Sequence, residues 1–334
     1  MSHVNNNKLT KHYWVWPIAW YLFLGGLGGG TLTLSGIFDF AFRNGIIDLG
    51  TGPLPEVGSV FALAVLIGVA ALGIGSFLLV FELGQPFVFL RVFLSSTAII
   101  KYGACLLVLA MGFGFVYFLF FLPPEWNLFY YSWTWIRDIC CALMIIFGLG
   151  IMVYTGVLLS SMKSKPFWNT PALPVLFTVS ALSTASALMA LTAGIWPGST
   201  FGLEREVQHF LVENLHVIDS VLVIGEIVVL LVYVLLQYGA GNVTARAVAT
   251  KWLRGSFAVP FWGGMLLAAL LIPFLSYMAG GVMATHVAPV LVLAGGLLLR
   301  FMIVYSDARR AIPGEERYWS RVPKGDEKFL TAWK

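Results

Sequence analysis

The sequence predicts an all-α membrane protein with eight transmembrane helices arranged as two four-helix bundles. Hydrophobic residues make up 59% of the 334 residues, charged residues only 11%, and the mean hydropathy is +0.87. A soluble domain carries about 25% charged residues, so this composition excludes an ordinary soluble domain. Long apolar runs recur along the sequence, and because they are continuous rather than alternating, they favour helices over a transmembrane β-barrel.

Eight apolar segments are long enough to cross about 30 Å of hydrocarbon as helices. The first is too long for the hydrophobic region of a signal peptide, so we interpret it as a membrane helix. The predicted segments lie near residues 14–38, 58–82, 99–122, 137–161, 172–196, 217–239, 257–279 and 284–306.

A short polar stretch, Lys163-Ser-Lys165-Pro166, separates the fourth apolar run from the fifth. We call residues 163–171 the basic hinge. The predicted organisation is then a first four-helix bundle at 1–162, the basic hinge, a second four-helix bundle at 172–306, and a polar basic tail at 307–334. The tail could face anionic lipid or dock a partner subunit, and the sequence leaves both interpretations open.

The distribution of charge predicts the orientation. The net charge of +4 gives no indication of a nucleic-acid partner. Both termini are expected on one side, which also carries most of the lysines and arginines, among them Lys8, Lys11, Arg91, Lys101, Lys163, Lys165, Arg246, Lys251, Arg254 and Arg300. The opposite side has three arginines and an excess of acids, namely Arg43, Arg137 and Arg205 with Asp39, Asp48, Glu56, Glu125, Glu204, Glu206 and Glu213. The positive-inside rule therefore places both termini in the cytoplasm.

The cysteines and histidines indicate no metal centre in this protein. Three cysteines cannot supply the four thiolates of an iron–sulfur cluster, and their spacing matches no metal motif. A membrane haem needs facing histidine pairs within the helices. The histidines instead fall before the first segment, in a predicted loop, or at segment starts, at His3, His12, His209, His216 and His286. We therefore predict no haem, no iron–sulfur cluster and no metal site.

Four ionisable residues fall within or at the edge of the apolar segments, where charge is costly and suggests function. Glu226 lies in the middle of segment six, and Asp219 precedes it by seven residues, so both share one helix face two turns apart. Glu82 ends segment two. Arg300 lies near the end of segment eight, where an internal ion pair or a side chain extended to the interface would explain it.

Two patterns of small residues have a packing interpretation and a functional one. Segment one contains Gly25, Gly26, Gly28, Gly29 and Gly30, which would allow close helix approach or leave room for a flat ring. Segment five carries hydroxyls that could bridge helices or line a water path, at Thr178, Ser180, Ser183, Thr184, Ser186 and Thr192. We take packing as the default in both cases.

Several stretches, in their order and spacing, resemble the membrane subunits of the NrfD / polysulfide reductase C family over nearly the whole sequence. They are Trp14-x-Trp16-Pro17-Ile18-Ala19-x-Tyr21-Leu22-Phe23, Leu79-Val80-Phe81-Glu82-Leu83-Gly84-x-Pro86, the central YTGVLLSSMKSKPFWNTPALPVLF with SALSTASAL, Gly225-Glu226, FWGG at 261–264 and GGLLLRF at 295–301. The NrfD branch is the most similar.

The resemblance implies two four-helix bundles without haem and a quinone, with menaquinone expected, bound near the face that carries the termini. It implies a partner with four ferredoxin-like iron–sulfur clusters docked on that face, and a molybdopterin or cytochrome catalytic subunit beyond it. It also implies a cytoplasmic (inner) membrane location. This protein would not be catalytic alone.

The family's quinone site carries over residue by residue. Tyr154 matches a tyrosine that hydrogen-bonds a quinone carbonyl, and Tyr21 stands where the polysulfide reductase type has a histidine. Ile18 replaces a quinone-binding asparagine, so one polar contact is missing. Glu82 matches an acid proposed to transfer protons near the quinone. The resemblance thus implies quinone binding by Tyr21, Tyr154 and Glu82, while depth in the membrane adds Asp219 and Glu226 to the proton-transfer candidates.

One departure concerns orientation, because well-studied members place the terminus-bearing face in the periplasm, whereas the charge bias here places it in the cytoplasm.

Three functions remain open at this stage. The first is a quinone-reactive membrane subunit of a respiratory oxidoreductase complex. The second is a proton-coupled secondary transporter, since two halves of four helices fit a repeat. The third is a purely structural membrane anchor.

Overall fold

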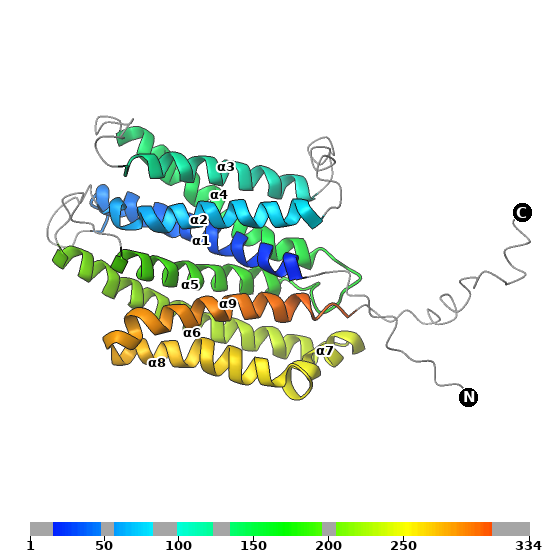
Figure 1. Cartoon of the computed structure of the whole chain (residues 1–334). Helices are drawn as coiled ribbons and strands as arrows, with labels where there is room; N and C mark the ends of the chain where they lie inside the picture. Colours follow the sequence, from blue (N-terminus) through cyan, green and yellow to red (C-terminus); the bar gives the residue numbers. More distant parts are fainter. Residues whose placement is uncertain (1–15, 48–56, 83–98, 123–133, 196–204, 309–334) are drawn as a thin grey trace, which may run out of the picture.

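The computed structural model describes residues 16–47, 57–82, 99–122, 134–195 and 205–308. Its helices lie side by side along one direction (Figure 1). In order along the sequence they are α1 Trp16–Arg43, α2 Gly58–Glu82, α3 Ile99–Leu119, α4 Thr134–Ser160, α5 Ala172–Ile195, α6 Arg205–Gly239, α7 Val243–Arg254, η4 Pro260–Leu271, α8 Ile272–Ala279, η5 Met283–Val287 and α9 Ala288–Val304.

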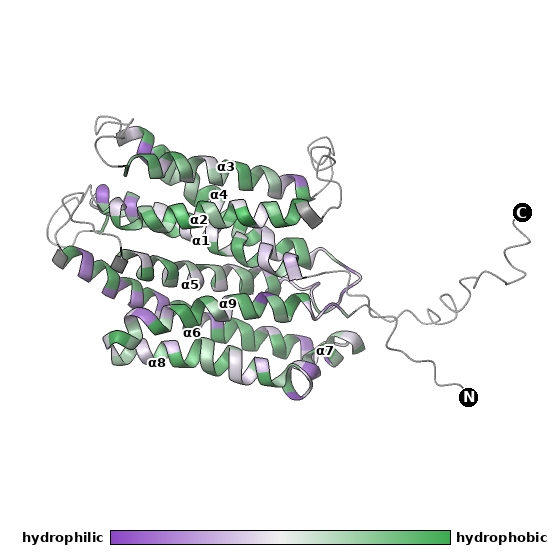
Figure 2. Ribbon diagram, in the orientation of Figure 1, coloured by the Kyte–Doolittle hydropathy of each residue, from purple (hydrophilic) through white to green (hydrophobic). Residues whose placement is uncertain are grey.

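The described helices include eight spans that are long and apolar enough to cross a membrane, with η4–α8 and η5–α9 each forming one span. Hydrophobic residues cover most of their length, and hydrophilic residues gather mainly toward the ends (Figure 2). The expectation of an all-α, multi-pass membrane protein is confirmed.

The spans alternate in direction, which gives the molecule two ends (Figure 1). The start of α1, the basic hinge, α7 and the end of α9 share one end, which we call the hinge end. The end of α1 and the starts of α2, α4 and α6 share the other, which we call the distal end.

Two elements differ from the sequence prediction. Helix α6 begins at Arg205 rather than near residue 217, so His209 lies in a helix instead of a loop and His216 lies well inside α6 rather than at its start. Its first turns carry exposed polar residues, which an apolar window cannot detect. Helix α7 was not predicted because its 12 residues are amphipathic and too short for a membrane span.

The last two spans begin in the wider π-helical form, as η4 and η5. Pro273 stands at the second residue of α8, directly after η4 ends. Proline has no N–H to donate, so the backbone bonding pattern changes at this point. The backbone then turns at Gly280 and Gly281, whose φ angles of 71° and 79° suit glycine.

Helix α1 lies at the centre of the molecule, and 83% of the residues in its most apolar stretch are buried inside the protein. It packs against α2, α4, α5 and α9. A Cβ atom on Gly28 would lie 2.6 Å from the Gly68 carbonyl oxygen, one on Gly29 2.8 Å from that of Gly148, and one on Gly30 2.5 Å from that of Ala181. These glycines bring α1 against the backbones of α2, α4 and α5, so they serve helix packing, as predicted.

Gly30→Ala is expected to weaken the fold. The added methyl group would meet the Ala181 carbonyl and lie 2.8 Å from the Ala185 Cβ, neither of which can rotate away. Overpacking of this kind costs about 1–3 kcal/mol. The loss of stability is measured by unfolding the purified protein with SDS in mixed micelles. Gly263→Ala is the control, because a Cβ atom there meets nothing within 4 Å. Equal midpoints for the two variants would contradict the packing role.

The basic hinge is tied to the end of α9 and the end of α6. Trp168 is fully buried and donates from its ring nitrogen to the Ile303 carbonyl over 2.8 Å. Lys165 lies over the Trp168 ring at 3.9 Å and pairs with Asp307 at 3.4 Å. Tyr233 donates to the Phe167 carbonyl over 2.6 Å. These contacts fix the connection between the two halves of the protein.

Candidate functional site

Two of the predicted quinone residues lie together near the hinge end. Tyr21 comes from the second turn of α1, and Tyr154 from the last two turns of α4. Their phenol groups lie close enough to interact with each other, and both side chains are buried, at 2% and 7% exposure. The pair comes together because α1 and α4 pack closely through their glycines.

A glycine of α3 makes room for this pair. A Cβ atom on Gly103 would lie 2.1 Å from Cζ of Tyr154 and 2.4 Å from its hydroxyl oxygen, so the phenol ring rests directly on the α3 backbone. Gly75 of α2 faces the Tyr21 ring at an ordinary van der Waals distance, because a Cβ atom on Gly75 would lie 3.6 Å from Tyr21 Cδ2. Two phenol O–H groups in this mainly apolar setting are suited to hydrogen-bond a carbonyl.

The third predicted quinone residue, Glu82, is the last residue of α2. Because α2 runs from the distal end to the hinge end, Glu82 lies at the hinge end, as does the tyrosine pair. Its side chain falls outside the described part of the structure. A cavity of about 320 Å³ also opens at the hinge end, but basic-hinge and α6–α7 residues line it, and it includes neither tyrosine.

Asp219 is fully buried in α6 and is held by two hydroxyl groups. Ser183 of α5 donates to Oδ1 over 3.1 Å, and Tyr277 of α8 donates to Oδ2 over 2.6 Å. The Tyr277 ring in turn stacks on His216, with the ring centroids 5.2 Å apart. His216 is 9% exposed, and its Nε2 atom has no hydrogen-bond partner among the described residues.

Glu226 lies two turns further along α6 and is 2% exposed. Its carboxyl group lies beside the Ser180 hydroxyl of α5, while its Oε1 atom has no partner within the described residues. The Ser180 hydroxyl accepts a hydrogen bond from Arg300 Nη1 over 2.5 Å. Ser180 therefore stands between a buried acid and a buried base, which is a polar arrangement that a membrane interior rarely holds without a function.

Arg300 does not extend to the interface, contrary to one of the interpretations considered from the sequence. It is 1% exposed, and its Nη2 donates to the Phe177 carbonyl over 3.1 Å. Its guanidinium lies 4.6 Å from the centre of the Phe177 ring, and Nη2 lies 3.3 Å from the Cβ position of Gly26. Arg300 thus contacts α1 at Gly26, five residues after Tyr21 along the helix.

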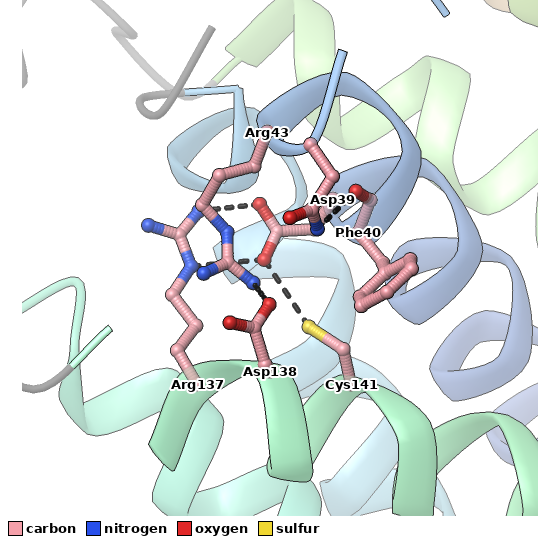
Figure 3. Close-up of polar contacts among 7 residues, drawn as sticks. Asp39, Phe40, Arg43, Arg137, Asp138 and Cys141 are labelled. Carbon is pink, nitrogen blue, oxygen red and sulfur yellow. Dashed lines mark hydrogen bonds and ion pairs between the residues drawn. The ribbon is translucent and has the colours of Figure 1, made fainter. Parts of the chain in front are cut away.

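A separate charged cluster joins α1 to α4 at the distal end (Figure 3). Asp39 is fully buried and accepts two hydrogen bonds from Arg137, one of them from Nε over 2.9 Å. The Cys141 thiol donates to the same carboxylate over 3.2 Å. Arg43 pairs with Asp138, whose side chain is 36% exposed. Asp39 therefore does not lie on the acidic surface to which the sequence assigned it.

The three free cysteines and the described histidines and acids gather into no group of three that could hold a metal ion within the described ranges. The polar chemistry of the described core consists of proton donors and acceptors. The tyrosine pair supplies hydroxyl donors at the hinge end, and α6 supplies two buried carboxyls deeper in the molecule.

Comparison with known proteins bears on what these groups do. The sequence profile of the family described as "Polysulphide reductase, NrfD" matches residues 4–308. The protein belongs to this family. The C subunit of polysulfide reductase from Wolinella succinogenes is 29% identical over 317 residues, which cover 88% of this protein and 93% of that subunit. Protein NrfD of Escherichia coli is 27% identical over 320 residues, covering 88% and 94%.

Membership of the family confirms the resemblance seen in the sequence. The structure brings Tyr21 and Tyr154 together and buries Asp219 and Glu226 on one face of α6, toward α5. No hydrogen bond or ion pair between described residues connects the tyrosine pair to these carboxyls. Quinone binding and proton transfer by these residues remain predictions.

Sequence reasoning missed the partners of the α6 carboxyls. Ser180 and Ser183 were interpreted as packing hydroxyls of segment five, with a water path as the alternative, but they were not matched to the carboxyls, and Tyr277 was not singled out. Ser180 and Ser183 are three residues apart on α5, and Asp219 and Glu226 are seven apart on α6, so both pairs follow one helix face. Each pair therefore recurs at a helical spacing, and this pattern could have predicted that the serines of α5 face the carboxyls of α6.

Proposed function

We propose that this protein is the quinone-reactive membrane subunit of a respiratory oxidoreductase complex in the cytoplasmic membrane. It would exchange electrons between the menaquinone pool and an iron–sulfur partner subunit docked at the hinge end. In this proposal the first bundle, residues 1–162, holds the quinone, and the second, residues 172–306, holds buried acids that move protons. Family membership and the buried tyrosine pair support it.

The observation that carries the proposal is the pairing of Tyr21 and Tyr154. Two phenol groups facing each other in an apolar interior have little structural purpose that phenylalanine would not serve equally well. A quinone presents two carbonyl oxygens, and a phenol O–H donates readily to such an acceptor. The pair also lies beside α2, where Gly75 faces the Tyr21 ring seven residues before Glu82.

Oxidation of a quinol releases two electrons and two protons. The electrons would pass to the nearest cluster of the four-cluster, ferredoxin-like partner, and from there to a molybdopterin or cytochrome catalytic subunit. Glu82 would accept protons at the hinge end, and Asp219 and Glu226 would carry protons deeper into the membrane. The membrane subunit itself then positions the quinol and supplies proton acceptors, while the substrate chemistry belongs to the partner.

Quinol oxidation by the assembled complex tests this function. Tyr154→Phe is expected to lower turnover roughly tenfold, because one hydrogen bond to the quinone is lost without a change in packing. Glu82→Gln is expected to lower it about 10²-fold, the lower range for loss of a positioned proton acceptor. Stopped-flow or steady-state oxidation of a soluble menaquinol analogue measures both.

The matched control is Tyr102→Phe, which removes the same hydroxyl from a tyrosine of α3 that is 62% exposed. Its turnover should equal that of the unmodified complex. Unchanged turnover in both Tyr154→Phe and Glu82→Gln would rule out the proposed site. A complex without bound quinone that resists quinone-site inhibitors would instead indicate a structural anchor.

A further inference from the structure

The buried polar residues of the second half form a line that runs from the distal end toward the middle of the membrane. We call this line the polar relay, and it consists of His216, Tyr277, Asp219, Ser183, Ser180 and Glu226. Arg300 ends it on the hinge side through its bond to Ser180. Asp219 and Glu226 are seven residues apart on α6, or about 10 Å at 1.5 Å per residue.

The polar relay continues to the surface at the distal end. Glu213 lies one turn before His216 on α6, with its side chain 63% exposed, and it interacts with His209, which is 77% exposed. The Nε2 atom of His216 is buried and has no partner among the described residues. Imidazole is the side chain that changes charge most readily near neutral pH. The order from the distal surface inward is therefore Glu213, His216, Tyr277 and Asp219.

Four aromatic rings pack together near the hinge end of the second half. Phe167 packs on Tyr233 and on Trp252, with ring centroids 5.3 Å apart in each pair, and Trp252 packs on Phe261 at 5.6 Å. All four are fully buried. Their polar atoms are occupied, since Tyr233 donates to the Phe167 carbonyl and the Trp252 ring nitrogen donates to Ser306. This layer lies seven residues beyond Glu226 along α6.

We propose that Glu226 exchanges protons with the distal face alone, through Asp219 and His216, and that the aromatic layer closes it off from the hinge face. The inference rests on the proposed function, since it names the side with which that function's buried acids communicate. The charged and titratable groups facing the polar relay are Arg300 from α9, Tyr277 from α8, and Glu213 with His209 from α6. His286 of η5 is exposed and takes no part.

Carbodiimide labelling tests this access without any redox turnover. Dicyclohexylcarbodiimide modifies a carboxyl in its protonated form, so the yield at Glu226, read by mass spectrometry, reports its protonation. The intact complex is labelled in sealed membrane vesicles of both orientations, with the pH set separately on each side. All variants also carry Ile46→Cys, at a distal-end position where the side chain is 68% exposed. A thiol reagent that cannot cross the membrane labels this cysteine only in vesicles whose distal face points outward.

Raising the pH at the distal face is expected to lower Glu226 labelling by up to about tenfold per pH unit, and raising it at the hinge face should leave labelling unchanged. His216→Phe keeps the stack on Tyr277 but removes the ring nitrogens, and it should slow the response about 10²-fold. Ser183→Ala provides a second, milder variant with slower response. His286→Phe is the matched control and should respond as the unmodified protein does.

Labelling that follows the hinge-face pH, or that follows the distal pH equally fast in His216→Phe and Ser183→Ala, would overturn the inference. So would a Glu226 that is never labelled. The test separates the inference from the proposed function, because quinol oxidation can fail in Tyr154→Phe while the side dependence of labelling persists. Conversely, an intact quinol response with hinge-side labelling would overturn the inference alone.

Discussion

Asp39→Ala is expected to destabilise the protein by about 3–5 kcal/mol, the range observed when one member of a buried ion pair is removed. The variant removes the carboxylate that Arg137 pairs with and leaves this arginine with only 11% of its side chain exposed. The start of α2 packs directly against the pair, because a Cβ atom on Gly58 would lie 2.6 Å from Asp39 Oδ1. The midpoint of SDS-induced unfolding in mixed micelles, monitored by circular dichroism, measures the loss.

The neighbouring ion pair supplies the control (Figure 3). Asp138→Ala removes the partner of Arg43, whose own side chain is only 9% exposed, but the carboxylate removed is 36% exposed whereas Asp39 is fully buried, so the loss should be smaller than in Asp39→Ala. A double variant, Asp39→Ala with Arg137→Leu, removes both buried charges and should recover much of the stability lost in the single variant. If Asp39→Ala and Asp138→Ala unfold at the same SDS fraction, burial does not determine the value of these pairs.

Gly103→Ala is expected to lower quinol oxidation by the assembled complex roughly tenfold, as Tyr154→Phe does, because a displaced phenol loses the same hydrogen bond to the quinone. The added methyl group would overlap the Tyr154 ring, with 2.1 Å to Cζ, so the phenol must leave its present position beside Tyr21. The measurement is the turnover of a menaquinol analogue, compared with that of Tyr154→Phe.

Gly112→Ala is the matched control on the same helix, since a Cβ atom there meets nothing within 4 Å. It should retain full turnover and stability. In the double variant Gly103→Ala with Tyr154→Phe, the two losses should not add, because both act through one phenol group. Additive losses would show that Gly103 affects turnover by another route than the tyrosine.

The membrane spans could be predicted because apolar length is a local property of the sequence. Helix α6 and helix α7 show its limit. The first three turns of α6 carry exposed polar residues such as His209 and Glu213, and their helical periodicity continues beyond the apolar window. Asn242 caps the start of α7 by accepting hydrogen bonds from the Thr244 and Ala245 N–H groups, and asparagine is a common N-cap residue. The 12 residues of α7 are amphipathic, however, and carry no long apolar run that would mark a helix between two spans.

The candidate site was less accessible from sequence because its contacts join distant segments. Tyr21 and Tyr154 were selected through the family resemblance, and no local pattern pairs residues so far apart. Asp219 and Glu226 were selected from their depth alone, without the hydroxyls that hold them. Asp39 and Arg137 lie 98 residues apart, and as residues near helix ends both were assigned to the charged surface. Their burial became visible only when α1 and α4 were packed together.

The central position of α1 has a consequence for how the protein is made. Proteins are synthesised from the N-terminus, so α1 enters the bilayer before any of its neighbours. Its apolar core stretch is the least hydrophobic among the described spans, and it becomes the most buried. Its glycine faces for α5 and α9 must therefore stay open to lipid until those helices are inserted. Assembly of the first half is completed only when translation has almost ended.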